Sequence, residues 1–163
     1  MKQAIIFGIT GQDGSHLADL LLSKGYHVVG VSRRASTDNT ERIRHILGND
    51  GFDLVQGDIT DVYSVQNILR QHANVDEVYN LAAQSHVAVS FKQPALTWDI
   101  TGKGCLNILQ SMVDLGIKAR FYQASSSEMF GKNFDTSQGD HSKYQDEDTK
   151  FMPQSPYAIA KCA

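Results

Sequence analysis

The segment Lys2-Gln3-Ala4-Ile5-Ile6-Phe7-Gly8-Ile9-Thr10-Gly11-Gln12-Asp13-Gly14 decides the fold. Its first half is a short apolar run, which is typical of a parallel strand buried on both faces. Glycines then fall at positions 8, 11 and 14, and residues 15–22 continue with helical apolar spacing. A strand, a tight turn and a helix are therefore expected. Such glycines also occur in ordinary turns, but between a strand and a helix they favour the binding of a pyrophosphate.

Strand-like and helix-like segments alternate along the rest of the chain. Strands are expected at 26–31, 52–56, 77–81 and 118–124, and helices at 41–47, 62–71 and from Pro94 to Gly116. This alternation predicts an α/β fold, a Rossmann-type doubly wound parallel sheet with ligands at the carboxyl ends of its strands. We expect a single domain over residues 1–163. The polar stretch from Lys132 to Gln154 is expected to be a mobile excursion.

Composition narrows the function classes. The 163 residues carry a formal charge of −3, with Lys and Arg scattered, so no basic face for nucleic acid is expected. No apolar run approaches the ~20 residues that span a membrane, and no leader precedes the first strand, which predicts a cytoplasmic protein. Cys105 and Cys162 lack metal-type spacing, so we expect reduced thiols and no metal site.

Near its end the chain carries the pair Tyr157 and Lys161. Residues four apart share a helix face, so the ammonium can stand one turn beyond the phenol. A phenol titrates near pH 10, and a nearby cation lowers its pKa enough for acid–base work. The alternative is a solvated surface pair. Beside the glycine-rich turn, the pair favours oxidoreductase chemistry on a nicotinamide cofactor.

The end of the second strand bears on the choice of cofactor. An acidic residue there would bind the ribose hydroxyl of NAD, whereas this chain has Arg33 and Arg34. Two guanidiniums suit a 2′-phosphate, which predicts NADP; the alternative is an exposed basic loop. Asp58 follows the third strand, where it can accept a hydrogen bond from the adenine amino group or cap the helix that begins near Thr60.

Five segments in order resemble the extended short-chain dehydrogenase/reductase superfamily and, within it, the GDP-mannose 4,6-dehydratases. They are Gly8 to Asp13, Arg33-Arg34, Tyr79 to Val87, Phe121 to Glu128, and the Tyr157/Lys161 pair. The resemblance implies NADP-dependent dehydration of the nucleotide sugar GDP-mannose, a lyase reaction through C4 oxidation, loss of water across C5 and C6, and hydride return to C6. It also implies a homo-oligomer, a dimer or tetramer, for the complete enzyme.

The resemblance assigns the site residues. Ser126, Glu128, Tyr157 and Lys161 are expected to be catalytic, and Ser85, Ser126 and Glu128 to contact the sugar. The alternatives are that Ser126 only caps the turn after its strand and that Glu128 is an exposed carboxylate near a helix start. The cofactor-binding residues are expected to be Gly8, Thr10, Gly11, Gln12, Asp13, Gly14, Arg33, Arg34, Asp58, Ile59, Leu81, Ala82, Ala83, Tyr157 and Lys161. His86 could contact the substrate, but a histidine beside an apolar loop is more often structural.

Two departures from the family pattern matter. Ser126 stands where these dehydratases usually have threonine, which keeps the hydroxyl and loses a methyl. The superfamily continues for well over a hundred residues beyond the Tyr-Lys helix, whereas this chain stops at Ala163. We therefore expect the C-terminal substrate-binding part to be absent. Two alternative functions stay open. One is a nucleotide-sugar 4-epimerase or reductase, from which the presence of Glu128 distinguishes a dehydratase. The second is a non-catalytic NADP-binding fragment.

Overall fold

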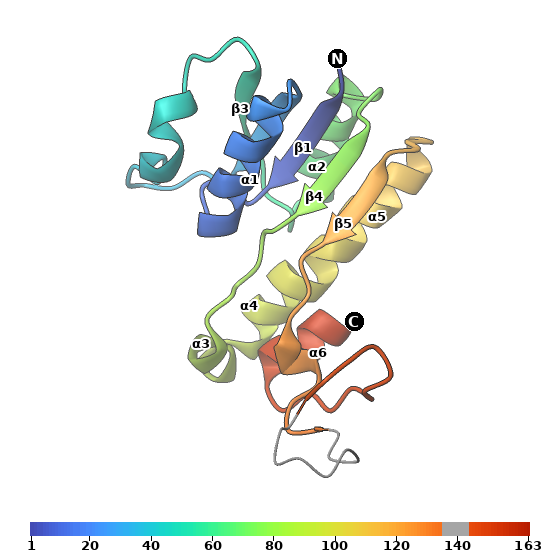
Figure 1. The fold of residues 1–163 in the computed structure, drawn as a ribbon. Helices are drawn as coiled ribbons and strands as arrows, with labels where there is room; N and C mark the ends of the chain where they lie inside the picture. The colour runs from blue at the N-terminus through green and yellow to red at the C-terminus, as the bar shows by residue number, and fades with distance from the viewer. Residues whose placement is uncertain (135–143) are drawn as a thin grey trace. The chain divides into compact units, whose positions relative to one another are not determined.

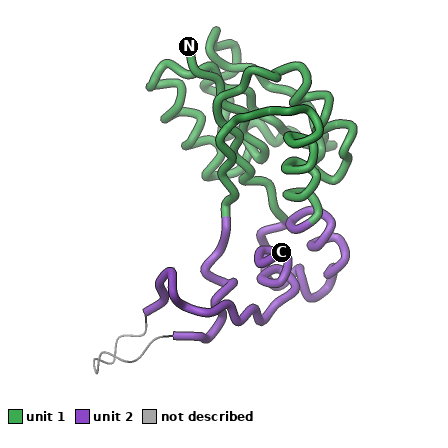
Figure 2. The backbone as a smooth tube through the Cα atoms, turned by 90° about the vertical axis from the view of Figure 1, so that its right-hand side faces the viewer, with its two compact units in different colours: residues 1–83, 103–124 green, residues 84–102, 125–163 purple. Residues whose placement is uncertain are grey.

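The computed structural model describes residues 1–134 and 144–163, which form two compact units (Figure 2). The sheet unit contains Met1–Ala83 and Lys103–Ala124. The helical unit contains Gln84–Gly102 and Ser125–Ala163. Each unit therefore joins segments that are far apart in the sequence. No helix within the described ranges is long and apolar enough to cross a bilayer.

The sheet unit is built on five parallel strands in the order β3-β2-β1-β4-β5 (Figure 1). The strands are β1 (Gln3–Phe7), β2 (His27–Ser32), β3 (Phe52–Gln56), β4 (Glu77–Asn80) and β5 (Arg120–Gln123). Ile6 pairs with Gly30 of β2 on one side and with Tyr79 of β4 on the other. The strand order thus reverses at β1, and a parallel sheet binds ligands beyond the carboxyl ends of its strands at such a point.

Helices cover both faces of this sheet (Figure 1). The helix α1 (Gln12–Ser23) and the 3₁₀-helix η1 (Glu41–Ile46) lie on one face, and α2 (Val62–Gln71) and α5 (Gly104–Asp114) pack together on the other. The predicted doubly wound α/β fold is confirmed. The predicted short helix at 41–47 is wrong in type, because these residues close 3₁₀ turns instead.

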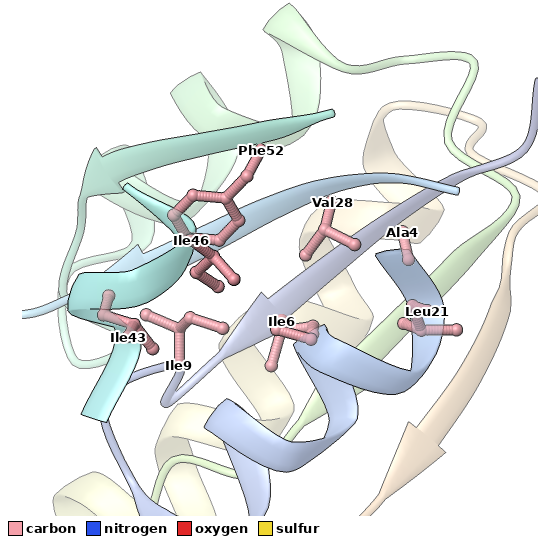
Figure 3. Close-up of a cluster of buried hydrophobic side chains, with 9 residues drawn as sticks. Ala4, Ile6, Ile9, Leu21, Val28, Ile43, Ile46 and Phe52 are labelled. Carbon is pink, nitrogen blue, oxygen red and sulfur yellow. The ribbon is translucent and has the colours of Figure 1, made fainter. Parts of the chain in front are cut away.

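The core between α1, η1 and the sheet explains the apolar run of the first strand. Alternate residues of β1 point to opposite faces, and all four from Ala4 to Phe7 are buried. One face contributes to a cluster of nine buried side chains (Figure 3), which consists of Ala4, Ile6, Ile9, Ala18, Leu21, Val28, Ile43, Ile46 and Phe52. Gly30 belongs to this packing, because a Cβ there would lie 2.6 Å from Cγ1 of Ile9.

The helical unit contains short elements. They are α3 (Val87–Lys92), α4 (Pro94–Trp98), the π-helical turn η2 (Asp99–Lys103, whose last residue belongs to the sheet unit), the 3₁₀ turn η3 (Ser127–Met129) and α6 (Pro156–Cys162). The predicted single helix after Pro94 is instead α4, η2 and α5 in succession, and α3 was not predicted. Residues 135–143 of the predicted excursion lie outside the described residues.

Candidate functional site

Two glycines of the turn after β1 are required by the backbone itself. Gly8 has a φ of +87°, in the left-handed region that favours glycine. A Cβ on Gly8 would lie 2.8 Å from the backbone nitrogen of Ala82 and 2.9 Å from the carbonyl carbon of Leu81. A Cβ on Gly14 would collide with the carbonyl oxygen of Gly8. These glycines therefore let β1, α1 and the segment after β4 approach closely.

Gly11 has a different surrounding. It is exposed, and the nearest atom to a Cβ there would be the Gly8 oxygen at 3.3 Å. It occupies the N-cap of α1, and lacking a side chain it cannot cap the helix. The free N–H groups of the first turn are therefore not covered by a capping side chain, which suits the binding of a phosphate. Gln12 and Asp13 are exposed in this first turn, and Thr10 is half-buried beside it.

Arg33 and Arg34 share a pocket with the segment after β3. Both are exposed directly after β2, and they line a cavity of about 470 Å³ together with Gln56, Gly57, Asp58 and Ser64. Of these residues, sequence reasoning missed Gln56, Gly57 and Ser64. The signal that could have found them is the glycine directly after the third strand, and a Cβ on Gly57 would lie 2.4–3.2 Å from neighbouring side chains. The pocket joins two guanidiniums to polar groups, as an adenosine 2′-phosphate requires.

Other charges of the following loop have partners elsewhere. Asp38 accepts hydrogen bonds from the backbone N–H of Thr40 at 2.8 Å and from its hydroxyl, and pairs with Arg44 at 3.0 Å. These bonds hold the pKa of Asp38 below its ordinary value, the Thr40 hydroxyl first. Nη1 of Arg42 donates to the carbonyl oxygen of Thr10 at 3.5 Å. Arg44 and Arg42 thus shape the loop and connect it to the glycine-rich turn.

The structure separates the two roles expected for Asp58. Its Oδ1 accepts from the backbone N–H of Thr60 at 2.9 Å and from its hydroxyl at 2.7 Å. The helix α2 is instead capped by Asp61, which accepts from the N–H of Tyr63 at 3.0 Å. The expectation that Asp58 caps this helix is wrong, because the helix begins later, at Val62. Asp58 still lines the pocket.

Hydrogen bonds from neighbouring side chains hold the remaining residues of the sheet unit that are expected to bind the cofactor. Ile59 is buried, and its carbonyl oxygen accepts from Nδ2 of Asn107 on α5 at 2.8 Å. Leu81, Ala82 and Ala83 are half-buried after β4. Asn80 and Gln123, to which the sequence analysis gave no role, hold this segment in place. The fully buried Asn80 side chain accepts a hydrogen bond from the Ala82 N–H at 3.3 Å and donates one to Gln123 on β5 at 2.8 Å. An unpaired Asn80 amide would be costly, so the pair fixes the ends of both strands.

In the helical unit, Ser126 and Glu128 share one turn. Oγ of Ser126 accepts from the Glu128 N–H at 3.2 Å and caps η3. Ser126 is half-buried, whereas Glu128 is exposed. The cap uses an oxygen lone pair of Ser126 and leaves the hydroxyl proton available to donate. This turn thus presents one hydroxyl donor and one carboxylate.

Tyr157 and Lys161 lie on α6 as the spacing predicts. Ser155 caps this helix by accepting from the Ala158 N–H at 3.0 Å, and Pro156 occupies its first turn. Tyr157 is buried, and Nζ of Lys161 lies 5.8 Å from the centroid of its ring. α6 packs against η3, so the element that carries Glu128 lies beside the helix that carries Tyr157.

Ser85 is exposed immediately before α3, and α6 also packs against α3 and α4. The N–H of Gln84 donates to the buried Thr101 hydroxyl on η2 at 3.3 Å, so the π-helical turn that periodicity missed anchors the segment carrying Ser85. Within residues 1–134 and 144–163, no three His, Cys, Asp or Glu side chains gather to hold a metal ion. Cys105 and Cys162 form no disulfide.

Comparison with known proteins identifies the family. The family model described as GDP-mannose 4,6 dehydratase matches residues 5–163. The chain belongs to the GDP-mannose 4,6-dehydratase family. It is 48% identical to a GDP-mannose 4,6-dehydratase from Vibrio cholerae, over 98% of this chain and 43% of that protein. It is 46% identical to GDP-mannose 4,6 dehydratase 2 from Arabidopsis thaliana, over 99% of this chain and 44% of that protein. The chain spans less than half the length of these relatives.

Solved structures share the fold. A UDP-glucose 4-epimerase from Thermotoga maritima, solved with UDP-glucose, has a TM-score of 0.81 and 28% identity, over 98% of this chain and 48% of that one. A dTDP-glucose 4,6-dehydratase from Streptomyces venezuelae, solved with NAD, has a TM-score of 0.83 and 26% identity over the same shares. Epimerases and dehydratases thus use one fold, so the reaction must be argued from the site residues.

Proposed function

We propose that residues 1–163 carry the cofactor site and the catalytic side chains of a longer GDP-mannose 4,6-dehydratase. The observation that carries this proposal is the packing of η3 against α6. It brings together the element with Glu128 and the helix with Tyr157 and Lys161. A phenol next to an ammonium suits oxidation of a sugar hydroxyl, and a neighbouring carboxylate supplies the base that loss of water requires.

The residues of the sheet unit fit a nicotinamide dinucleotide, and NADP in particular. The exposed N-cap at Gly11, which has no side chain, suits a pyrophosphate, and the pocket of Arg33 and Arg34 suits a 2′-phosphate. Solved relatives in fold are described with NAD bound, which supports a nicotinamide cofactor in general. The preference for the phosphorylated form rests on the two arginines.

The chemistry assigns a separate task to each side chain. Tyr157, with the Lys161 ammonium on the same helix, takes the proton of the sugar O4, while the Ser126 hydroxyl donates to that oxygen. A nicotinamide cofactor held by the glycine-rich turn and the two arginines would supply reversible hydride exchange with the sugar, which the C4 oxidation and the later reduction at C6 both require. Glu128 removes the C5 proton, which the C4 ketone acidifies, and passes it to the departing 6-hydroxyl. Water leaves, and a solvent proton later returns to C5.

The rest of the proposal concerns the complete enzyme, by which we mean these residues joined to the C-terminal part that the relatives carry. That part would hold the nucleotide sugar, with Ser85 contributing from this chain. The cytoplasmic location and the homo-oligomeric state remain predictions from the sequence. An epimerase or reductase, and a non-catalytic NADP-binding protein, are the competing functions.

Single-turnover reaction of the complete enzyme with GDP-mannose and NADP tests the proposal. We expect a product that has lost one water, with no net accumulation of reduced nicotinamide. In E128Q, C4 oxidation should persist while water loss slows by roughly 10²–10⁴-fold, the usual range for general acid–base catalysis. E147Q, which changes an exposed carboxylate of the same unit, is the matched control. A product that keeps its C6 hydroxyl would favour the epimerase or reductase, and binding without turnover would favour the non-catalytic protein.

A further inference from the structure

The turn that carries Glu128 is too short to be stable through its own hydrogen bonds. η3 has three residues, and single 3₁₀ turns have weak internal hydrogen bonding. The Glu128 carbonyl oxygen accepts from the N–H of Gly131 at 3.2 Å, and Gly131 has a φ of +56°. A Cβ on Gly131 would collide with the carbonyl oxygen of Met152. The conformation of this turn therefore depends on a segment that returns from later in the sequence.

The side chain of Gln145 connects the returning segment to the turn that carries Glu128. Its Nε2 donates to the carbonyl oxygen of Gly131 at 3.3 Å and to that of Asn133 at 3.1 Å. Both partners are acceptors only, which requires the donor side of the amide to face them. One half-buried side chain thus uses both of its N–H groups on the turn that follows Glu128.

Further contacts complete a clasp, defined here as Met129, Gly131, Asn133, Gln145, Lys150 and Met152. Nδ2 of Asn133 donates to the Lys150 carbonyl oxygen at 2.7 Å, and the Met152 N–H donates to the Met129 carbonyl oxygen at 2.9 Å. The rings of Phe130 and Phe151 pack beside it, with centroids 5.3 Å apart. The backbone on both sides of η3 is therefore tied to the returning segment.

We propose that Gln145 is a positioning residue for Glu128. The path is a chain of two hydrogen bonds, from the Gln145 amide to the Gly131 carbonyl and from the Gly131 N–H to the Glu128 carbonyl. The start of α6 has its own cap at Ser155, which accepts from the Ala158 N–H at 3.0 Å, so loss of the Gln145 bonds should act on Glu128 and leave Tyr157 in place. The inference rests on the proposed function, because it takes Glu128 as the base that acts at C5.

The test measures two steps in the complete enzyme under single-turnover conditions. Transient absorbance of the reduced nicotinamide reports C4 oxidation, and deuterium incorporated from solvent at C5 reports proton removal. Q145L and Q145E both remove the amide donors at similar volume. Each should slow proton removal about 10- to 100-fold, the scale of an ångström-sized misplacement, with C4 oxidation within about twofold of the unmodified rate. E147Q is the matched control, because Glu147 is exposed in the same returning segment and lies outside the clasp.

The E128Q enzyme, measured alongside, separates the possible failures. If E128Q slows proton removal selectively but Q145L and Q145E leave it unchanged, or slow both steps equally, Gln145 does not position the base and this inference is overturned. If E128Q itself leaves proton removal unchanged, the proposed function is wrong at Glu128, whatever the Gln145 variants do. Thermal unfolding of each variant shows whether a loss of both steps reflects an unfolded fraction.

Discussion

The two units hold their functional groups in different ways. In the sheet unit, the glycine-rich turn follows β1 and the segment 81–83 follows β4. Hydrogen bonds to neighbouring strands fix the ends of β1 and β4, and buried Asn80 also links β4 to β5. In the helical unit, Glu128 and Tyr157 lie on η3 and α6, which are too short to be stable alone. Regular structure thus positions the residues proposed to bind the cofactor, whereas the side chains proposed to be catalytic depend on individual caps and the clasp.

Replacing Tyr157 by phenylalanine should have the largest effect. The change removes the hydroxyl that is proposed to start the reaction, so C4 oxidation and water loss in the complete enzyme should both fall by roughly 10³–10⁴-fold. NADP binding should persist, because the glycine-rich turn belongs to the sheet unit. Single-turnover kinetics and cofactor titration measure the two properties. A Y157F enzyme that still oxidises C4 at the unmodified rate would remove Tyr157 from the mechanism.

The second-largest effect is expected when both arginines of the pocket are replaced. In the double variant R33A/R34A, NADP affinity should fall about 100-fold, since charge-assisted hydrogen bonds contribute roughly 1.5–3 kcal/mol each and exposure reduces that value. NAD affinity should hardly change. Calorimetric titration with both cofactors checks the difference, and R44A is the control because Arg44 pairs with Asp38. Equal affinities for NAD and NADP in the unmodified protein would contradict the expected preference.

The glycines of the turn should separate into two classes. G14A should lower the free energy of unfolding by about 1–3 kcal/mol, because the new Cβ meets the Gly8 backbone. G11A should cost less, under about 1 kcal/mol, because its Cβ would meet a single backbone oxygen at 3.3 Å, while NADP binding should weaken about 10-fold because the new methyl lies at the exposed N-cap of α1. Chemical denaturation and cofactor titration distinguish them. Equal destabilisation by both variants would mean that Gly11 also serves internal packing.

The smallest expected effect concerns the opposite end of the sheet. Buried Glu77 accepts from Tyr79 at 2.7 Å and from Arg120 at 2.8 Å, and the Tyr79 bond, with the nearby cations, holds its pKa below the ordinary value of 4.5. Burial and the bond to Glu77 raise the pKa of Tyr79 to about 12. A pKa lower in the folded state adds stability above about pH 4.5, which is lost as pH falls through the folded value.

E77Q should therefore cost about 1–2 kcal/mol of unfolding free energy near neutral pH, and the difference from the unmodified protein should shrink on acidification. Denaturation at a series of pH values checks the direction. D50N, at an exposed carboxylate, is the control. A difference that grows as pH falls would show that the Glu77 network acts in the opposite sense.

The two units also differ in how much of their structure could be predicted from the sequence. The β1 run, the glycine spacing and the Tyr157/Lys161 pair follow from local periodicity, and the structure places them as expected. The clasp could not be predicted, because Gln145 reaches Gly131 only through tertiary packing. The Asp61 cap was missed because Asp58 offered an equally good local pattern. The π-helical turn η2 was missed because its sequence, DITGK, has a single large apolar residue and buries the polar Thr101, so apolar spacing carries no signal there.

The transfer of one hydrogen tests the central claim most directly. GDP-mannose labelled with deuterium at C4 is converted by the complete enzyme, and the product is analysed by mass spectrometry and NMR. Oxidation by Tyr157, water loss through Glu128 and return of the same hydride predict that the deuterium moves to C6, with no net reduced cofactor. Deuterium found again at C4 of a sugar that keeps its C6 hydroxyl would contradict a dehydratase and identify an epimerase.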